Sequence, residues 1–312
     1  MAARHRMATI LAACLMTAVG VSGAAAAEIS LGEPLGTVAG LMRPESVAVA
    51  PDGRYVISNI NGDATEKDGN GFLTVVDRQG ADSRLYPVGD APPLHAPKGI
   101  CVAGRALAVT DIDRIAIIEE GNARFIPQSY GTLATPTFLN DITYDGAQWL
   151  YASDTRLGRV LRFSLDGKRV EEVATDVAGV NGLLWHEGKL IIGASGPDLL
   201  RSRDHPEAEG ARGGQHDLAE IDVAGGAPPK WFGLAEHFTM IDGIAALEDG
   251  TLIVTDPRAG TIYAVSPDRK TVTKLKTDLP FPADCTVDLR RQLLLVPMLQ
   301  GDTAVAFRLV RR

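Results

Sequence analysis

The sequence has little cysteine and no long apolar run beyond its first residues. It holds three cysteines among 312 residues, and Cys14 lies in the N-terminal segment. The other two, Cys101 and Cys285, are too few for a disulfide framework, and we expect buried free thiols rather than a bridge or a catalytic pair. No later stretch approaches the roughly 18 uninterrupted apolar residues that a spanning helix needs. The sequence therefore favours neither a disulfide-stabilised fold nor an integral membrane protein.

Several common catalytic motifs are also missing. We find no Gly-x-Ser-x-Gly elbow, no phosphate-binding glycine-rich loop, no His-Glu-x-x-His and no Cys-x-x-Cys. Acidic residues outnumber Lys and Arg, and the formal net charge is −8. An acidic surface argues against nucleic acid or an anionic membrane as a partner and is compatible with cation binding.

The first 27 residues have the pattern of a secretory signal peptide. Arg4, His5 and Arg6 precede an apolar stretch, and Ala25-Ala26-Ala27 stand just before Glu28. Its removal takes away two arginines and no acid, which leaves a mature charge of −10. We therefore expect a periplasmic or secreted protein. The alternative is a lipoprotein anchored at Cys14, whose cleavage site would leave the better alanine-rich site unused.

One sequence phrase recurs six times and organises the chain. It consists of a short apolar strand, a tight polar turn, a second apolar strand and a closing polar residue. The starts lie 53, 42, 41, 61 and 42 residues apart, near the period of a four-stranded propeller blade. The copies begin at Glu45, Lys98, Asn140, Asn181, Asp242 and Asp284.

The later strands of each copy complete the prediction. Third strands are expected at 159–163 and 261–265, and fourth strands near 171–174 and 271–275. The last copy lacks a fourth strand, whereas residues 29–38 precede the first copy without a partner. We therefore predict an all-β fold: a six-bladed β-propeller of four-stranded blades, forming one domain over 28–312, whose ring is closed by the N-terminal strand. A β-sandwich or two smaller propellers would not produce six copies in register.

The starts of the six phrases predict a polar ring at one mouth of the central channel. Carboxylate and carboxamide oxygens, without clustered histidine or cysteine, suit a hard cation such as Ca²⁺. Glu45, Asn181 and Asp242 are the predicted ligands, and Asn140, Lys98, Phe138 and Asp284 are predicted to face a substrate. A second tier of residues at the same mouth is expected from the phrase ends, which are Asn59, Asp111, Asp154, Ser195, Asp256 and Met298. The alternative is a wet polar channel in which Lys98 neutralises its neighbours.

At these residues the chain resembles the senescence-marker-protein/gluconolactonase family, the regucalcin-like lactonases, over essentially its whole mature length. The family holds one divalent cation through a Glu of the first blade, an Asn-Gly pair and an Asp-Gly pair, matched here by Glu45, Asn181-Gly182 and Asp242-Gly243. A further family Asn is matched by Asn140-Asp141. The arginine that usually stands two residues earlier is replaced by Phe138, and Lys98 is another departure.

The resemblance implies a metal-dependent hydrolase of a lactone or related ester, with Asp242 as general base and ligand. The cation would be Ca²⁺, with Zn²⁺, Mn²⁺ or Mg²⁺ as alternatives. Apolar Phe138, Met240 and Met298 would favour a less hydroxylated substrate or simply pack between blades. A non-catalytic binding or scaffold propeller remains the competing hypothesis. A paraoxonase-like lactonase is a weaker one, and a strictosidine-synthase-like propeller lacks a candidate catalytic Glu in the fourth blade.

Other polar residues near the predicted mouth have weaker interpretations. His95 and His237 could shuttle protons or simply be solvated. The loops 61–71 and 196–217 are expected to overhang the mouth. Asp63, Asp68 and Asn70 could hold a second Ca²⁺, although their spacing does not match an EF-hand. Oligomeric state cannot be inferred from the sequence.

Overall fold

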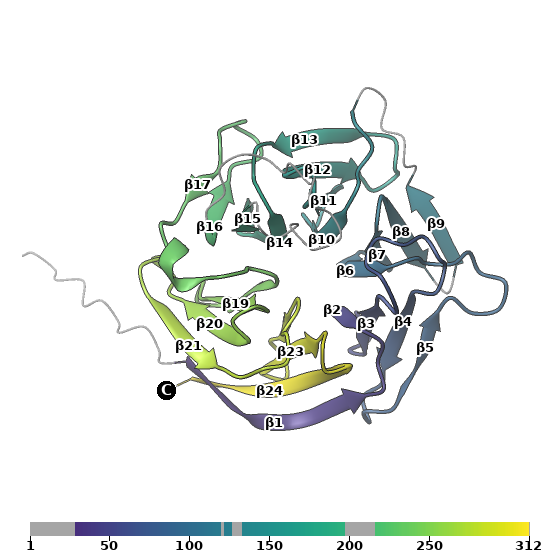
Figure 1. Ribbon diagram of the computed structural model, residues 1–312, viewed down its shortest axis with the longest axis horizontal. Helices are drawn as coiled ribbons and strands as arrows, with labels where there is room; N and C mark the ends of the chain where they lie inside the picture. Colours follow the sequence, from purple (N-terminus) through teal and green to yellow (C-terminus); the bar gives the residue numbers. More distant parts are fainter. Residues whose placement is uncertain (1–28, 120–121, 127–132, 197–215, 312) are drawn as a thin grey trace, which may run out of the picture.

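The chain forms a closed ring of six antiparallel sheets in a computed structural model (Figure 1). The structure describes residues 29–119, 122–126, 133–196 and 216–311. The predicted signal peptide and most of the loop 196–217 lie outside the described residues. Among the described residues, regular structure consists of strands and one short 3-10 turn, Ala235–His237. None of the helices in this part is long and apolar enough to cross a membrane.

Each blade has four strands that follow one another outward from the axis. The blades comprise β2 (Pro44–Val49), β3 (Tyr55–Asn59), β4 (Phe72–Val76) and β5 (Asp82–Tyr86); β6 (Pro97–Ala103), β7 (Ala106–Asp111), β8 (Arg114–Glu119) and β9 (Asn122–Ile126); β10 (Leu139–Tyr144), β11 (Trp149–Asp154), β12 (Arg159–Ser164) and β13 (Val170–Ala174); β14 (Val180–His186), β15 (Lys189–Ser195), β16 (His216–Ile221) and β17 (Lys230–Trp231); and β18 (Ile244–Ala246), β19 (Leu252–Asp256), β20 (Thr261–Val265) and β21 (Val272–Lys276).

The sixth blade joins the two ends of the described chain. It contains β22 (Thr286–Asp288), β23 (Leu293–Met298) and β24 (Thr303–Arg311), and its outermost strand is β1 (Ile29–Ala39). β1 pairs antiparallel with β24 from Ile29 opposite Arg311 to Ala39 opposite Thr303. The predicted six blades, their four strands and the N-terminal closing strand are all confirmed.

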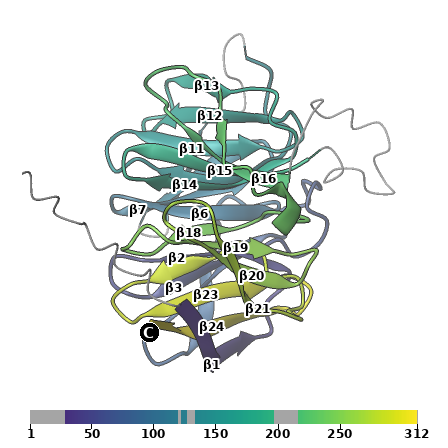
Figure 2. The same ribbon diagram turned by 90° about the vertical axis from the view of Figure 1, so that its left-hand side faces the viewer.

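The apolar core lies between the blades rather than in one central mass. Every neighbouring pair of blades shares its own cluster of buried apolar side chains, so the strands are covered on both faces. The stacking of the blades is seen edge-on in Figure 2. This double burial explains why the strand sequences read as nearly continuous apolar runs. Cys101 and Cys285 are free, and burial raises the pKa of both thiols, as expected for cysteines used as packing residues.

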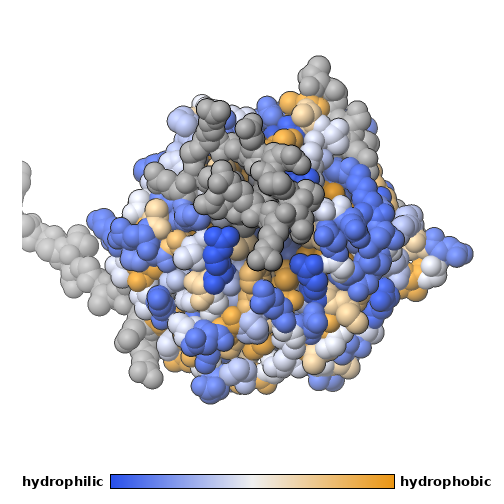
Figure 3. All heavy atoms as spheres, viewed as in Figure 1, coloured by the Kyte–Doolittle hydropathy of each residue, from blue (hydrophilic) through white to orange (hydrophobic). Residues whose placement is uncertain are grey.

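The outer surface is polar and has scattered apolar side chains. Figure 3 shows hydrophilic groups mixed with apolar ones over one face of the ring. Large exposed apolar residues of the described chain are few and lie on separate segments: Leu35, Met42, Val88, Leu157 and Leu289. Single exposed apolar residues of this kind are common on protein surfaces.

The innermost strands approach one another closely at the axis. A Cβ added to Gly182 would lie 2.0 Å from the carbonyl oxygen of Asp242, on the next blade. A Cβ on Gly243 would lie 2.4 Å from the backbone nitrogen of Cys285, again on the next blade. Backbone atoms cannot yield as a flexible side chain can. The Asn-Gly and Asp-Gly pairs in the sequence are therefore needed for blade packing as well as for their polar members.

Replacing Gly182 by alanine should destabilise the ring. The added methyl group would push the strand carrying Asn181 away from Asp242, and overpacking of this kind costs about 1 to 3 kcal/mol. Denaturant unfolding of Gly182→Ala measures the loss. Gly36→Ala is the matched control, because a Cβ there meets nothing within 4 Å, and it should change stability by less than about 0.5 kcal/mol. Equal stability of the two variants would contradict the packing argument.

Candidate functional site

The ring residues stand at irregularities in the innermost strands. Pairing of the first two strands shifts register between Pro44 and Val47 in the first blade and between Leu139 and Ile142 in the third, and the second and fourth blades repeat the shift. A bulge of this kind re-aims a side chain and removes a ladder hydrogen bond. In these four blades it turns the first residue of the phrase toward the axis.

Hydroxyl groups of the second strand accept hydrogen bonds from backbone N–H groups near the start of the innermost strand. Ser58 Oγ accepts a hydrogen bond from the Ser46 N–H at 2.9 Å, and Ser153 Oγ accepts one from Asp141 N–H at 2.9 Å. In the fifth blade Thr255 Oγ1 accepts from Gly243 N–H at 2.7 Å. The recurring Ser or Thr before the closing polar residue of a phrase thus has a structural role.

The closing polar residues themselves hold loops rather than a ligand. Asp111 accepts from the N–H of His95 and Ala96, and Asp256 accepts from the N–H of Thr239 at 2.6 Å. Asn59 and Asp154 bind the corresponding loops of their blades. All of these side chains, with Ser195 and Met298, are buried and none lines the cavity described below. The prediction that a second tier faces the mouth is therefore not supported.

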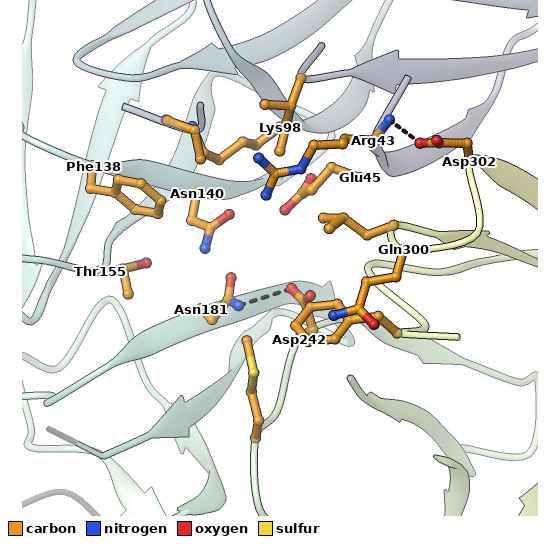
Figure 4. Close-up of a pocket in the computed structure, with 15 residues that line it drawn as sticks. Arg43, Glu45, Lys98, Phe138, Asn140, Thr155, Asn181, Asp242, Gln300 and Asp302 are labelled. Carbon is orange, nitrogen blue, oxygen red and sulfur yellow. Dashed lines mark hydrogen bonds between the residues drawn. The ribbon is translucent and has the colours of Figure 1, made fainter. Parts of the chain in front are cut away.

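A cavity of about 580 Å³ opens at the axis and is lined by five of the six ring residues, Glu45, Lys98, Asn140, Asn181 and Asp242 (Figure 4). Apolar side chains form much of its wall: Ile60, Ala64, Phe138, Met240, Phe281 and Leu299. Arg43, Thr155, Gln300 and Asp302 complete it. A mostly apolar hollow with a few convergent polar groups is typical of a small-molecule site.

Sequence reasoning missed part of this lining. Leu299, Gln300 and Asp302 come from the turn after β23, where the sequence shows no ligand-like pattern. Arg43 lies two residues before Glu45, and this closeness to a predicted ligand was the one sequence feature that could have indicated it as a lining residue.

Four oxygen-bearing ring residues from four different blades line the cavity: Glu45, Asn140, Asn181 and Asp242 (Figure 4). Asn181 Nδ2 donates to Asp242 Oδ1 at 2.8 Å, which leaves Asn181 Oδ1 without a partner. Glu45 Oε2 and Asn140 Oδ1 are also buried without a hydrogen-bond partner among the described residues. Buried acceptors of this kind are costly unless something binds them. Within the described chain no three His, Cys, Asp or Glu side chains form a metal cluster.

Asp284 and Asp141 occupy the channel wall outside the cavity lining. Asp284 accepts hydrogen bonds from Ser46 Oγ at 2.5 Å and from Cys285 N–H at 2.7 Å. Asp141 accepts from the N–H of Leu183 and of Ile142. Both carboxylates therefore tie neighbouring strands together. The predicted contact of Asp284 with a substrate stays a prediction.

Burial and mutual repulsion disfavour ionisation of the axial carboxyl groups. Burial, then the charge of Asp284, raises the pKa of Asp242 to about 8. Burial raises the pKa of Asp284 to about 6. Burial and neighbouring acids also raise the pKa values of Glu45 and Asp141 well above their usual range. Protons or a cation must compensate this cluster.

The remaining sequence candidates divide between the cavity and its surroundings. Phe138 and Met240 line the cavity, whereas Met298 is buried outside it. His95 Nδ1 accepts from the Gly69 N–H at 3.1 Å and His237 belongs to the 3-10 turn, and neither lines the cavity. Asp63 and Asp68 accept hydrogen bonds within their own loop, from Thr65 and Asn70.

No protein-family model and no curated protein matches the chain. Solved structures do. A protein provisionally described as a gluconolactonase superposes with a TM-score of 0.64 at 14% identity, over 93% of this chain and 94% of that one. The likeness is one of fold. It agrees with the resemblance to regucalcin-like lactonases inferred from the sequence.

Other propellers of similar shape have different roles. Virginiamycin B lyase from Staphylococcus aureus, solved with quinupristin, gives a TM-score of 0.59 at 13% identity, over 91% of this chain and 100% of that one. A chain of a nidogen/laminin complex gives 0.56 at 16% identity, over 75% of this chain and 79% of that one. One fold thus includes an enzyme and a member of a protein complex, so function must be argued from the site.

The stability of the chelator-treated protein should fall as pH rises. An acid whose pKa is higher in the folded than in the unfolded chain stabilises the fold only while protonated. For Asp284 and Asp242 the loss should run from near their ordinary value of 3.8 to about 6 and about 8. Thermal unfolding across that window measures it. Asp284→Asn should flatten the lower part of the curve, and a melting temperature that rises with pH would contradict the assignment.

Proposed function

We propose that the protein is a divalent-metal-dependent hydrolase of a lactone or related ester. The observation that supports this most directly is the set of buried, unpartnered oxygens of Glu45, Asn140 and Asn181 beside Asp242 in the axial cavity. Oxygen donors of mixed carboxylate and amide type are those that Ca²⁺ prefers. Glu45, Asn181 and Asp242 would hold the cation, and Asn140 would face the substrate. Zn²⁺, Mn²⁺ and Mg²⁺ are the alternatives to be tested.

The chain's own residues would divide the reaction between them. A bound divalent cation supplies Lewis acidity toward an ester carbonyl. Asp242, oriented by its hydrogen bond from Asn181, takes a proton from the attacking water. The water oxygen bonds to the carbonyl carbon, the ester C–O bond breaks, and the leaving oxygen takes up a proton. Apolar Phe138, Met240 and Leu299 limit bulk water around the reacting group.

Metal binding can be tested without knowing the substrate. Calorimetric titration of the purified protein with Ca²⁺ should show one site, and an Asn181→Ala, Asp242→Ala double variant should lose at least about 100-fold in affinity. Asp90→Ala, which alters an exposed acid that does not line the cavity, is the control and should bind normally. If the unchanged protein binds none of the four cations, the metallohydrolase proposal fails.

Catalysis is tested by a screen of lactones and esters with the metal-loaded protein. Asp242→Ala should lower kcat/KM by about 100- to 10,000-fold, because it removes both the base and a ligand.

A second candidate function is a metal-stabilised binding propeller without chemistry. Phe138, standing where the resemblance leads us to expect an arginine, favours that alternative, as would metal binding without turnover of any ester.

We also propose that the mature protein is exported. The charged start, apolar stretch and alanine-rich end of residues 1–27 support a cleaved signal peptide. Expression of the full chain in a Gram-negative host, with intact-mass analysis of the periplasmic fraction, should show a chain beginning at Glu28. A lipid-modified Cys14 or an uncleaved cytoplasmic product would contradict it.

A further inference from the structure

Two cationic side chains line the cavity and form no direct ion pair among the described residues, although the charges of Glu45, Asp111 and Asp63 attract Lys98 through space. Lys98 is 1% exposed, and its Nζ donates to the backbone oxygens of Ala64 at 2.9 Å and Ala96 at 3.0 Å. Arg43 Nη1 donates to the backbone oxygen of Gly62. The ion pairs found in the described part of the chain include neither cation.

Lys98 differs from another buried cation in having no direct ion pair, whereas Arg43 is exposed. Arg159, which is also deeply buried, pairs with Asp154 and with Glu172 at 3.1 Å each. A buried charge normally has such a partner, because desolvation is costly. Carbonyl acceptors orient Lys98 and Arg43 but do not cancel their charge.

The backbone around Arg43 and the loop 61–71 holds both cationic side chains in place. Arg43 has a φ of 50°, which is unusual for a side chain other than glycine, and its N–H donates to Asp302 Oδ1 at 2.7 Å. Two of the three carbonyls that accept hydrogen bonds from these cations, those of Gly62 and Ala64, belong to the loop 61–71. The ammonium of Lys98 also lies 4.5 Å from the ring centroid of Phe138. The loop that interrupts the repeat therefore aims two cations at one side of the cavity.

The charge balance of the cavity favours an anion. Its charged lining residues are Glu45, Asp242, Asp302, Arg43 and Lys98, with a formal charge of −1. A divalent cation among the oxygens changes this to +1. Figure 4 shows Arg43 and Lys98 on the same side of the cavity as Glu45, opposite Asn181 and Asp242. A ligand between the two sides would meet Asn181 and Asp242 at one end, and Arg43 and Lys98 beside Glu45 at the other.

We propose that the substrate carries a carboxylate group, bound by Arg43 and Lys98, while its scissile carbonyl lies at Glu45, Asn181 and Asp242. This inference rests on the proposed function. The donors left over after the backbone contacts, one N–H of Lys98 and the free edge of Arg43, match the two oxygens of a carboxylate better than the three of a phosphate. Phe138 and Met240 would contact the apolar part of the molecule.

The test compares two substrates that differ only in charge, γ-butyrolactone γ-carboxylate and its γ-carboxamide. The metal-loaded protein should hydrolyse the carboxylate with at least about tenfold higher kcat/KM. Arg43→Gln and Lys98→Met should each reduce that preference, mainly by raising KM for the carboxylate. Arg308→Gln, an exposed arginine on β24, is the control. Thermal unfolding checks that the buried Lys98→Met variant folds, and exposed Arg43→Gln tests the subsite independently.

The outcomes separate this inference from the proposed function. Equal hydrolysis of both lactones, unchanged in the variants, overturns the carboxylate subsite while the hydrolase stands. If neither lactone is hydrolysed, calorimetry with the ring-opened product, hydroxyglutarate, tests whether the cavity binds a carboxylate. Binding that Arg43→Gln weakens at least about tenfold supports the anion subsite in a binding protein, and no binding overturns it. Inorganic phosphate binding more tightly than hydroxyglutarate would also overturn the choice of a carboxylate.

Discussion

The crowding of six innermost strands around one axis is the constraint on which the rest of the structure depends. Gly182 and Gly243 are required there because the backbone of the next blade occupies the place of a Cβ. The same crowding removes water from Glu45, Asp141, Asp242 and Asp284 and raises their pKa values. Packing geometry and chemistry are therefore not independent here. The packing that brings the strands together also buries these four acids and thereby disfavours their ionisation.

The site combines acidic and basic side chains within one cavity. The oxygen-bearing side chains come from the regular part of the repeat, at bulges supported by hydroxyl groups such as Ser58 and Ser153. The placement of the basic side chains depends on an exception to the repeat, since the loop 61–71 provides carbonyls for Arg43 and Lys98. A propeller can thus keep one part of its site constant and alter the other through a single loop, because loops tolerate change better than packed strands.

Much of the fold could be predicted from the sequence because the repeat is long and in register. Equal spacing within the phrases located the strands, and the unpaired N-terminal strand indicated how the ring closes. The roles of individual polar residues were harder to predict. Asp111 and Asp242 are both acids at a strand end, yet one holds a loop and the other lines the cavity. They differ in their place in the blade, because Asp242 precedes the innermost strand β18 whereas Asp111 ends the second strand β7. Gln300 and Asp302 were missed because they reach the cavity from a turn with no pattern of its own.

The pairing of β1 with β24 sets the order in which the molecule can be completed. β1 is synthesised before any blade, and its partner is synthesised after all of them. Until then the first strand has an open edge, and the sixth blade lacks its outer member. Five blades can assemble locally as they emerge, whereas the last waits for the two extremes of the chain to meet. A ribosome that stops early therefore yields an unclosed ring, and exposed strand edges mark such products for proteolysis.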